Sequence, residues 1–320
     1  MKRSRRPARV RWALAACLVV AAATGTGCGG GGTPGGARGP LGQAGSGGRL
    51  SWAVADRPLA VDPLLARTRA ERIVCRQLYE PLVEQLHGPF GEVRIEPGIG
   101  IPHPNHAGTV WRLRLRSGVR YQDGRRFDAG AVLANVHRWQ ATSEGQALLP
   151  DLVAADSPRP DLVRFFLDRA DLDFSADLGS PRLGVVSPRA IGTSGYITAP
   201  ARAGLGPFEL RERSADHALL ARNLNWWGTD HGLGPALDQV DLRVAAGAAQ
   251  RLRMLRSGEV QAADELGSAQ IRKLRRDPLL TFLSDHRGEA LGLERSVRGI
   301  DSAAEIPILS GTWLTTIGAG

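Results

Sequence analysis

The stretch RLRLRSGVRYQDGRRFDAGAVLANVHRW, residues Arg112–Trp139, predicts a strand, a turn and a helix in direct succession. In its first part and the residue before it, Trp111, Leu113 and Leu115 alternate with arginines. A period of two gives a strand one apolar face and one solvated face. This part of the chain therefore predicts a half-buried strand that belongs to a larger fold.

The second part of the same stretch predicts a turn followed by a helix. Gly118 and Asp123-Gly124 are turn residues, because glycine tolerates positive φ and aspartate bonds its own backbone. Asp128 can cap the next segment. One face of that segment repeats apolar residues at spacings of four and three, namely Val132, Val136 and Trp139.

Similar short elements continue along the chain and favour a mixed α/β domain over an all-α or all-β one. Residues 69–86 have a helical period, but Glu80-Pro81 interrupts it, so we expect that helix to end near Tyr79. The other expected elements are strands at 50–55, 93–95, 110–115, 163–167, 208–213, 218–222 and 240–244, and a helix at 248–256.

Length and charge limit the classes of function. A chain of 320 residues with 42% hydrophobic content can form one large or two ordinary domains with a sizeable core. Its formal charge of +9 includes six basic residues within the first eleven positions. The body carries no clustered basic stripe interleaved with aromatic residues, so we do not expect nucleic acid as a partner.

The first residues predict export and a lipid anchor. A basic start precedes the apolar run Trp12–Ala23, which has the length of a secretory signal rather than of a membrane span. Small residues then precede Cys28, as in a bacterial lipoprotein signal. We expect residues 1–27 to be the signal peptide, Cys28 to be the lipid attachment site, and the glycine-rich residues 28–48 to form a flexible tether.

Cysteine usage fits export without disulfide bonds. Cys17 lies in the expected signal peptide and Cys28 would carry the lipid, so Cys75 has no partner. Apolar neighbours and the absence of an activating group indicate that Cys75 is a buried small hydrophobe rather than a nucleophile.

Three stretches of the chain form a recognisable pattern when they are taken together. The first is LAVDPLLARTRAERIVCRQLYEPLVEQL, with an aspartate-proline turn and a Tyr-Glu-Pro-Leu element. The second is EPGIG, followed by VWRLRLRSGVRYQDGRRFDAGAVLANVHRW. The third is GLGPFELRERSADHALLARNLNWWG, continued by LDQVDLRV and RLRMLRSGEV. Together these stretches resemble the family 5 extracellular solute-binding proteins, the oligopeptide, dipeptide and nickel receptors of ATP-driven importers. Their order and spacing make the resemblance specific.

The resemblance implies the first lobe of a class II clamshell of the periplasmic-binding-protein type, with a mixed sheet and flanking helices, over residues 49–265. The family pattern is expected to be lost after Asp264. Residues 266–320 would then replace the second lobe, with Ile306–Leu309 and Trp313–Ile317 able to return to the first lobe as strands. Such a chain would be a truncated or degenerate receptor that binds its solute weakly.

The implied function is non-enzymatic capture of a small peptide or similar solute, without a cofactor or metal, for the permease of an ABC transporter. The ligand-binding candidates are Arg57 after the first strand, Tyr79 at the helix end, and Gly206 near the cleft. The Trp226-Trp227-Gly228 element favours core packing over a platform on which a ligand stacks.

Two other functions remain open from the sequence. A surface lipoprotein could keep the same scaffold and use it to bind another protein. A metal-dependent hydrolase could use His87, His103 and His106 as ligands. Two prolines around His103 favour an extended loop, and no carboxylate or cysteine lies nearby in the sequence to complete a metal site.

Overall fold

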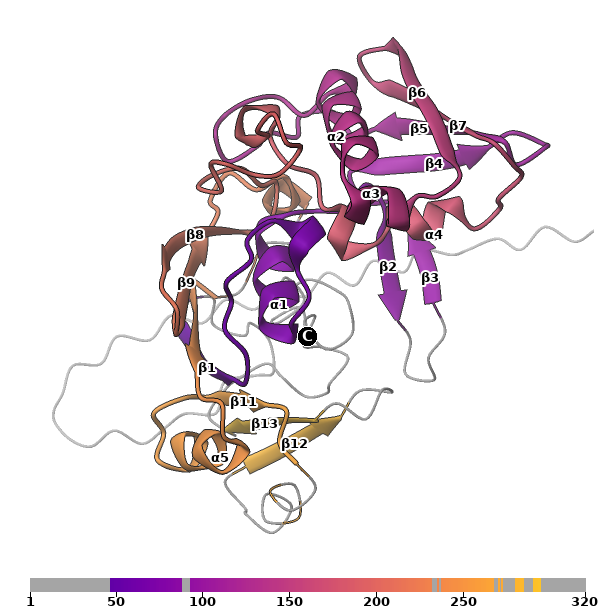
Figure 1. Ribbon diagram of the computed structural model, residues 1–320. Coiled ribbons are helices and arrows are strands. Elements are labelled where there is room, and N and C mark those ends of the chain that lie inside the picture. The colour runs from indigo at the N-terminus through magenta and orange to yellow at the C-terminus, as the bar shows by residue number, and fades with distance from the viewer. Residues whose placement is uncertain are drawn as a thin grey trace, which may run out of the picture. The chain divides into compact units, whose positions relative to one another are not determined.

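The largest element of the fold is a seven-stranded sheet with the first strand, β1 (Arg49–Val54), at its centre (Figure 1). The computed structural model describes residues 47–87, 93–231, 235, 237–267, 270, 272, 280–284 and 290–294. The sheet runs β12 (Leu280–Ser284), β13 (Ala290–Glu294), β11 (Ala262–Asp264), β1, β10 (Gln239–Val244), β9 (His217–Arg222) and β8 (Phe208–Arg213). β1 pairs in parallel with β10 and β11, and the other pairs are antiparallel.

Helices α1 (Arg69–Leu78) and α5 (Ala248–Arg256) pack against opposite faces of this sheet. Trp52 belongs to the core that contains α1, whereas Ala53 belongs to the core that contains α5. This separation follows from the alternation of side chains along a strand. A capping box between Thr68 and Glu71 fixes the start of α1.

A second core lies under a four-stranded antiparallel sheet. Its strands, in order, are β4 (Gly100–Pro104), β5 (Val110–Leu115), β7 (Leu162–Leu167) and β6 (Leu152–Arg159). This core also includes residues of α2 (Ala129–Ala141) and α4 (Phe174–Leu178), and α3 (Ser143–Leu148) follows α2 directly. The pair β2 (Glu84–His87) and β3 (Val93–Glu96) forms a separate small sheet.

Four short 3-10 turns complete the described secondary structure: η1 (Pro63–Leu65), η2 (Pro181–Leu183), η3 (Pro188–Ala190) and η4 (Trp227–His231). Proline begins the first three of them, where its fixed φ suits the turn and its missing N–H leaves no bond unmade. Within the residues that the structure describes, no helix is long and apolar enough to cross a membrane.

The opening stretch folds as the sequence predicts. β5 buries Trp111, Leu113 and Leu115 and exposes the arginines between them. Gly118 and Gly124 have φ values of 79° and 85°, and the Asp128 carboxylate accepts the backbone N–H of Ala131 to cap α2. Buried Val132, Val136 and Trp139 lie along the inner face of α2.

The first helix also ends as predicted, with Tyr79 as its C-cap. The helical period of residues 79–86 does not continue the helix, because Pro81 cannot supply the N–H bond that a further turn needs. The chain instead enters β2. β4, β6 and β11 were not predicted from the sequence, because they are rich in proline, polar residues or alanine rather than in β-branched residues.

Several predictions fall on residues that the structure does not describe. These are the signal peptide at 1–27, Cys28, the tether except for Gly47 and Gly48, and the strands at 306–309 and 313–317. Cys75 is described, and it is buried at 1% exposure with the pKa of its thiol raised well above the usual value by burial. The interpretation of Cys75 as a buried small hydrophobe is confirmed.

Candidate functional site

Two of the predicted ligand-binding residues, Tyr79 and Gly206, meet at the C-terminal end of α1. The backbone N–H of Gly206 donates to the carbonyl of Leu78 at 2.9 Å. A Cβ on Gly206 would lie 2.3 Å from the carbonyl oxygen of Gln77, so the close approach of the two backbones requires glycine there. The Leu-Gly-Pro element therefore fixes the chain before β8 against the last turn of α1.

Tyr79 is buried at this junction, at 1% exposure. Its side chain lies close to Gly184 and Gly204, and burial raises the pKa of its hydroxyl well above the usual value. Arg57 is exposed in the segment after β1, where its carbonyl accepts the N–H of Leu59 at 2.9 Å. Among the described residues, no hydrogen bond or ion pair joins Arg57 to the other two candidates.

Glu80, the next residue, ties the junction to the turn after β9. One carboxylate oxygen of Glu80 accepts the indole N–H of Trp226, and the other accepts that of Trp227 at 2.7 Å. Glu80 is only 1% exposed, and burial, followed by the neighbouring charge of Glu84, raises its pKa from 4.5 to about 8.

The tryptophans themselves support the packing interpretation of the Trp226-Trp227-Gly228 element. Trp226 is 3% exposed, and its ring occupies the space that a Cβ on Gly228 would need. Trp227 is half-buried beneath the Arg116 guanidinium, which lies 4.4 Å from its ring centroid.

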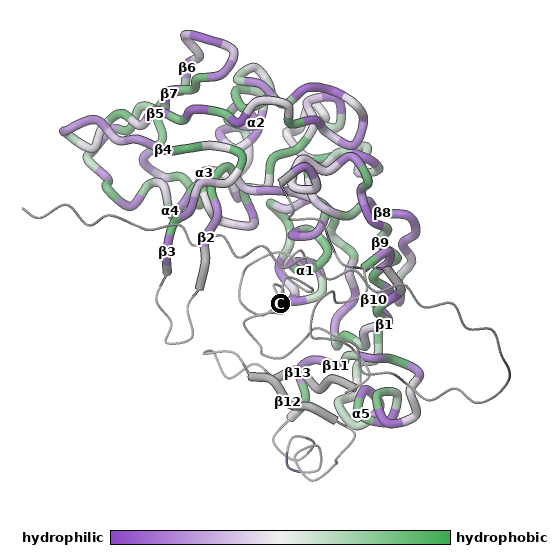
Figure 2. The backbone as a smooth tube through the Cα atoms, turned by 180° about the vertical axis from the view of Figure 1, so that it is seen from behind, coloured by the Kyte–Doolittle hydropathy of each residue, from purple (hydrophilic) through white to green (hydrophobic). Residues whose placement is uncertain are grey.

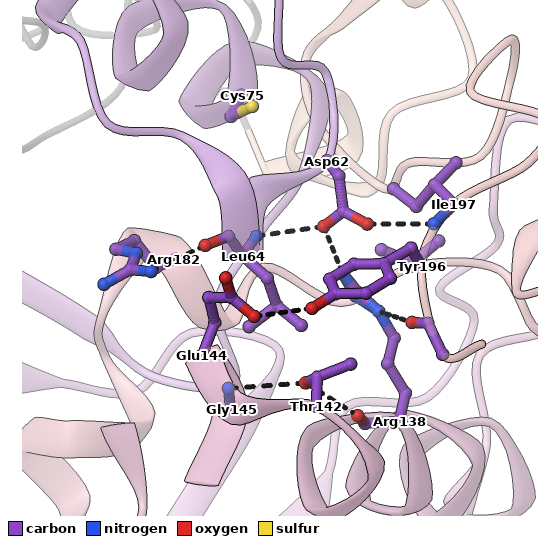
Figure 3. A network of polar contacts seen from close by, with 12 residues as sticks. Asp62, Leu64, Cys75, Arg138, Thr142, Glu144, Gly145, Arg182, Tyr196 and Ile197 are labelled. Carbon is purple, nitrogen blue, oxygen red and sulfur yellow. Dashed lines mark hydrogen bonds and ion pairs between the residues drawn. The ribbon is translucent and has the colours of Figure 1, made fainter. Parts of the chain in front are cut away.

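A second network joins the chain between β1 and α1 to the second core, with Asp62 at its centre (Figure 3). One Asp62 carboxylate oxygen accepts the N–H of Leu64 at 3.0 Å and pairs with the buried guanidinium of Arg138. The other accepts the N–H of Ile197 at 2.9 Å. Arg138 also donates to the carbonyl of Gly195 at 3.0 Å, so three distant segments are held in one geometry.

The accessible side of this network carries both signs of charge. The Glu144 carboxylate accepts the hydroxyl hydrogen of Tyr196 at 2.6 Å and lies 3.5 Å from the Arg67 guanidinium. The hydrogen bond from Tyr196 lowers the pKa of Glu144, so Glu144 is anionic at neutral pH. The Arg182 guanidinium donates to the backbone carbonyl of Leu64 at 2.6 Å, and Figure 3 shows it on the same side of the network as Glu144.

We name Arg67, Glu144, Arg182 and Tyr196 the charged rim. A carboxylate and a guanidinium within one ion-pair distance can bind the two ends of a zwitterionic solute or the polar groups of a peptide backbone. These four residues were not predicted from the sequence, because they lie far apart in the chain. The one local indication of this network in the sequence was the Asp62-Pro63 pair, which predicts a turn.

The histidines considered as metal ligands do not form a group in the described part of the chain. His103 and His106 are exposed, and His103 lies in β4 opposite Arg112 of β5. The side chain of His87 is outside the description. The described residues include no group of three or more histidine, cysteine, aspartate or glutamate side chains that could hold a metal ion.

Comparisons with curated proteins give relatives that bind solutes. The chain is 26% identical over 216 residues to the glutathione-binding protein GsiB of Escherichia coli K12, an alignment that covers 66% of this chain and 41% of the relative. It is 29% identical over 160 residues to GsiB of Salmonella paratyphi A, covering 49% of this chain and 31% of the relative. The chain therefore spans less than half the length of these relatives.

Solved structures show the same fold. The periplasmic binding protein DppA from Helicobacter pylori, in complex with the peptide STSA, matches with a TM-score of 0.65 at 22% identity, covering 74% of this chain and 50% of that one. NikA from Brucella suis, in complex with Fe(III)-EDTA, matches with a TM-score of 0.65 at 22% identity. This match covers 73% of this chain and 48% of NikA. The predicted mixed α/β fold of the clamshell type is confirmed.

The family model for bacterial extracellular solute-binding proteins, family 5 Middle, matches residues 102–296. This match continues beyond Asp264, so the expectation that the family pattern is lost there is wrong. The segment after Asp264 includes β12 and β13, which extend the large sheet beside β11. The chain belongs to the bacterial extracellular solute-binding proteins of family 5.

Proposed function

We propose that the protein captures a peptide-like solute outside the cytoplasmic membrane and delivers it to the permease of an ABC importer. The observation that carries this proposal is a match of fold. The chain matches about half the length of one receptor solved with a peptide and of another solved with a metal chelate. The relatives named as glutathione-binding proteins support a short, charged, peptide-like solute. The function proposed is binding without catalysis, metal or cofactor.

The charged rim is the part of the described surface that best fits such a solute. Glu144 can accept the N–H groups of a solute ammonium, while Arg67, with 76% of its side chain exposed, can bind a carboxylate. Asp62 and Arg138 lie behind the rim and fix its position, because neither group is free to rotate. This arrangement separates the groups that contact solute from the groups that orient them.

The three residues predicted from the sequence enter the proposal in different roles. Arg57 is exposed and can contact solute directly. Tyr79 and Gly206 are buried, and we propose that they shape the wall behind the solute through the junction at the end of α1. Substitutions at these two positions are therefore poor tests of binding, because they would first disturb packing.

Binding to the described residues alone should be weak. We propose that they form one side of a solute cleft, and a solute held on one side keeps much of its surface in water while it still loses its translational freedom. We expect dissociation constants of about 1 mM for the 320-residue chain with glutathione or a tetrapeptide.

Ligand-observed NMR titration tests this proposal at such affinities. Glu144→Gln and Arg67→Gln should each weaken binding about tenfold, since each removes one charge-assisted hydrogen bond. Arg125→Gln, at an exposed position outside the rim, is the matched control and should leave the titration unchanged. Equal binding by all three variants would exclude the rim, and no saturable binding by the parent chain would exclude the proposed solute class.

We also propose that the exported chain is anchored through lipid on Cys28. The basic start, the short apolar run and the small residues before Cys28 support this proposal. Cys28→Ser should release the protein from the membrane fraction of a bacterial host. Unchanged membrane association of the substituted protein, measured after cell fractionation, would contradict it.

A further inference from the structure

The outer face of the four-stranded sheet gathers arginines from three neighbouring strands. β5 turns its apolar residues toward the second core, so Arg112 and Arg114 point to the opposite face and are exposed. Arg112 lies opposite His103 of β4 and Arg164 of β7. Arg159 of β6, the edge strand beside β7, is exposed and lies opposite Leu162 of β7.

Acidic residues neutralise only part of this charge. Arg164 forms a bidentate pair with Asp156, with N–O distances of 2.7 and 2.5 Å, and Arg159 pairs with Asp161 at 3.1 Å. Among the described residues, no acidic side chain forms an ion pair with Arg112 or Arg114. Arg112 is also the direct cross-strand partner of Arg164, whose charge Asp156 already balances, so Arg112 and Arg114 are the arginines of this face that are left for an external anion.

Apolar side chains lie between the arginines on this face. Ile101 and Leu162 are the cross-strand neighbours of Arg114, and both are half-buried. The guanidinium of Arg164 lies 5.6 Å from the ring centroid of Phe166. The hairpin between β6 and β7 consists of hydrophilic residues (Figure 2).

These features fit a surface of phosphate groups above an apolar layer. Arginine binds phosphate oxygens in a bidentate manner, and the apolar residues between arginines can reach the boundary of the acyl chains. Each arginine near an anionic bilayer adds a measurable attraction that falls off within a Debye length. A strand-built face presents its arginines to many lipid headgroups at once.

We propose that this face, formed by Arg112, Arg114, Arg159 and Arg164, docks on the surface of an anionic phospholipid membrane. The contact would set the orientation of the body relative to the bilayer. The inference stands apart from the lipid anchor and from the solute site, because none of its residues belongs to either.

Sedimentation with lipid vesicles tests the inference. The full chain is mixed with vesicles of phosphatidylglycerol and phosphatidylcholine, or of phosphatidylcholine alone, and bound protein is measured. The double variant Arg112→Glu/Arg114→Glu is compared with Arg211→Glu/Arg213→Glu, which changes two exposed arginines at the same spacing on β8. All chains share the basic N-terminal residues, so any binding through them cancels in this comparison.

We expect the β5 variant to bind anionic vesicles at least about tenfold more weakly than the parent, and the β8 variant within about threefold of it. Circular dichroism establishes that each variant is folded. Equal loss in the two variants, or equal binding of the parent to both vesicle types, would overturn the inference. Tighter binding of soluble polyglutamate than of anionic vesicles, with the same dependence on Arg112 and Arg114, would also overturn it and indicate an acidic protein partner.

Discussion

Glu80 and Asp241 are both buried carboxylates, and their surroundings move their pKa values in opposite directions. Burial is the largest influence on each and raises the pKa. Glu80 has two indole N–H groups as partners, which are neutral, and its pKa reaches about 8. Asp241, whose side chain is fully buried, lies 2.5 Å from Arg49 and 2.9 Å from Arg243, and these cations lower its pKa below the usual value.

The difference shows that the charge of the partners, more than the number of hydrogen bonds, decides whether a buried carboxylate keeps its proton. The Nε2 atom of His217 lies 2.5 Å from the other carboxylate oxygen of Asp241. Glu80 therefore stabilises the junction at the end of α1 through hydrogen bonds from neutral indole groups. Asp241 of β10 instead binds the Arg49 guanidinium of β1 and the His217 imidazole of β9.

The largest expected effect comes from removing the Glu80 side chain. Glu80→Ala leaves the buried N–H of Trp226 without an acceptor and opens a cavity at the end of α1. We expect a loss of about 3 to 5 kcal/mol in the free energy of unfolding, measured by urea denaturation. Glu212→Ala, an exposed control on β8, should change it by less than about 0.5 kcal/mol. A loss below about 1 kcal/mol for Glu80→Ala would show that the junction does not depend on the carboxylate.

Replacing the charge at Asp241 should have a smaller effect. Asp241→Asn keeps the shape but removes the anion between Arg49 and Arg243, and we expect a loss of about 2 kcal/mol at neutral pH, since both cations remain partly exposed. Because the folded pKa of Asp241 lies below its usual 3.8, its stabilisation is complete above that pH and is lost as the pH falls through the folded value. Thermal unfolding at neutral and acid pH measures both effects. The exposed ion pair of Arg159 and Asp161 is the control. Asp161→Asn should lower the free energy of unfolding by less than about 1 kcal/mol. Equal costs at the two positions would refute the role of burial.

The smallest effect, counted per pH unit, is the pH dependence of stability that Glu80 causes. The folded pKa of Glu80, about 8, lies above its usual 4.5, so the folded protein holds a proton that the unfolded chain releases between these values. Stability should therefore fall as the pH rises through this window, by up to about 1.4 kcal/mol per pH unit. Glu80→Gln should flatten this slope in urea denaturation, and Glu212→Gln should retain it. A slope that persists in Glu80→Gln would assign the titration to another group.

The elements that the sequence predicted are those with a strong local period or a clear terminator. β5 and α2 follow from the alternation and spacing of Trp111, Leu113, Val132 and Val136, and the end of α1 follows from Pro81. β4, with the sequence GIPHP, has no such period, and its pairing with β5 decides its conformation. Tertiary pairing overrides weak local preference at such positions.

The charged rim could not be predicted for a different reason. Arg67, Glu144 and Tyr196 come from three segments whose approach depends on the buried pair of Asp62 and Arg138. No local pattern marks that approach. Gly206, in contrast, belongs to a family element, and the structure explains it through a backbone contact that leaves no room for a side chain.

The parallel pairing of β1 with β10 also governs when the protein can fold. Gly48, beside β1, donates to Asp238, a separation of 190 residues in the chain. At a synthesis rate of about 5 to 20 residues per second, the partner of the first strand emerges roughly 10 to 40 s after it. Such long-range pairing gives a high contact order and slow folding. The first strand therefore stays unpaired with β10 in the nascent chain until that later strand has emerged.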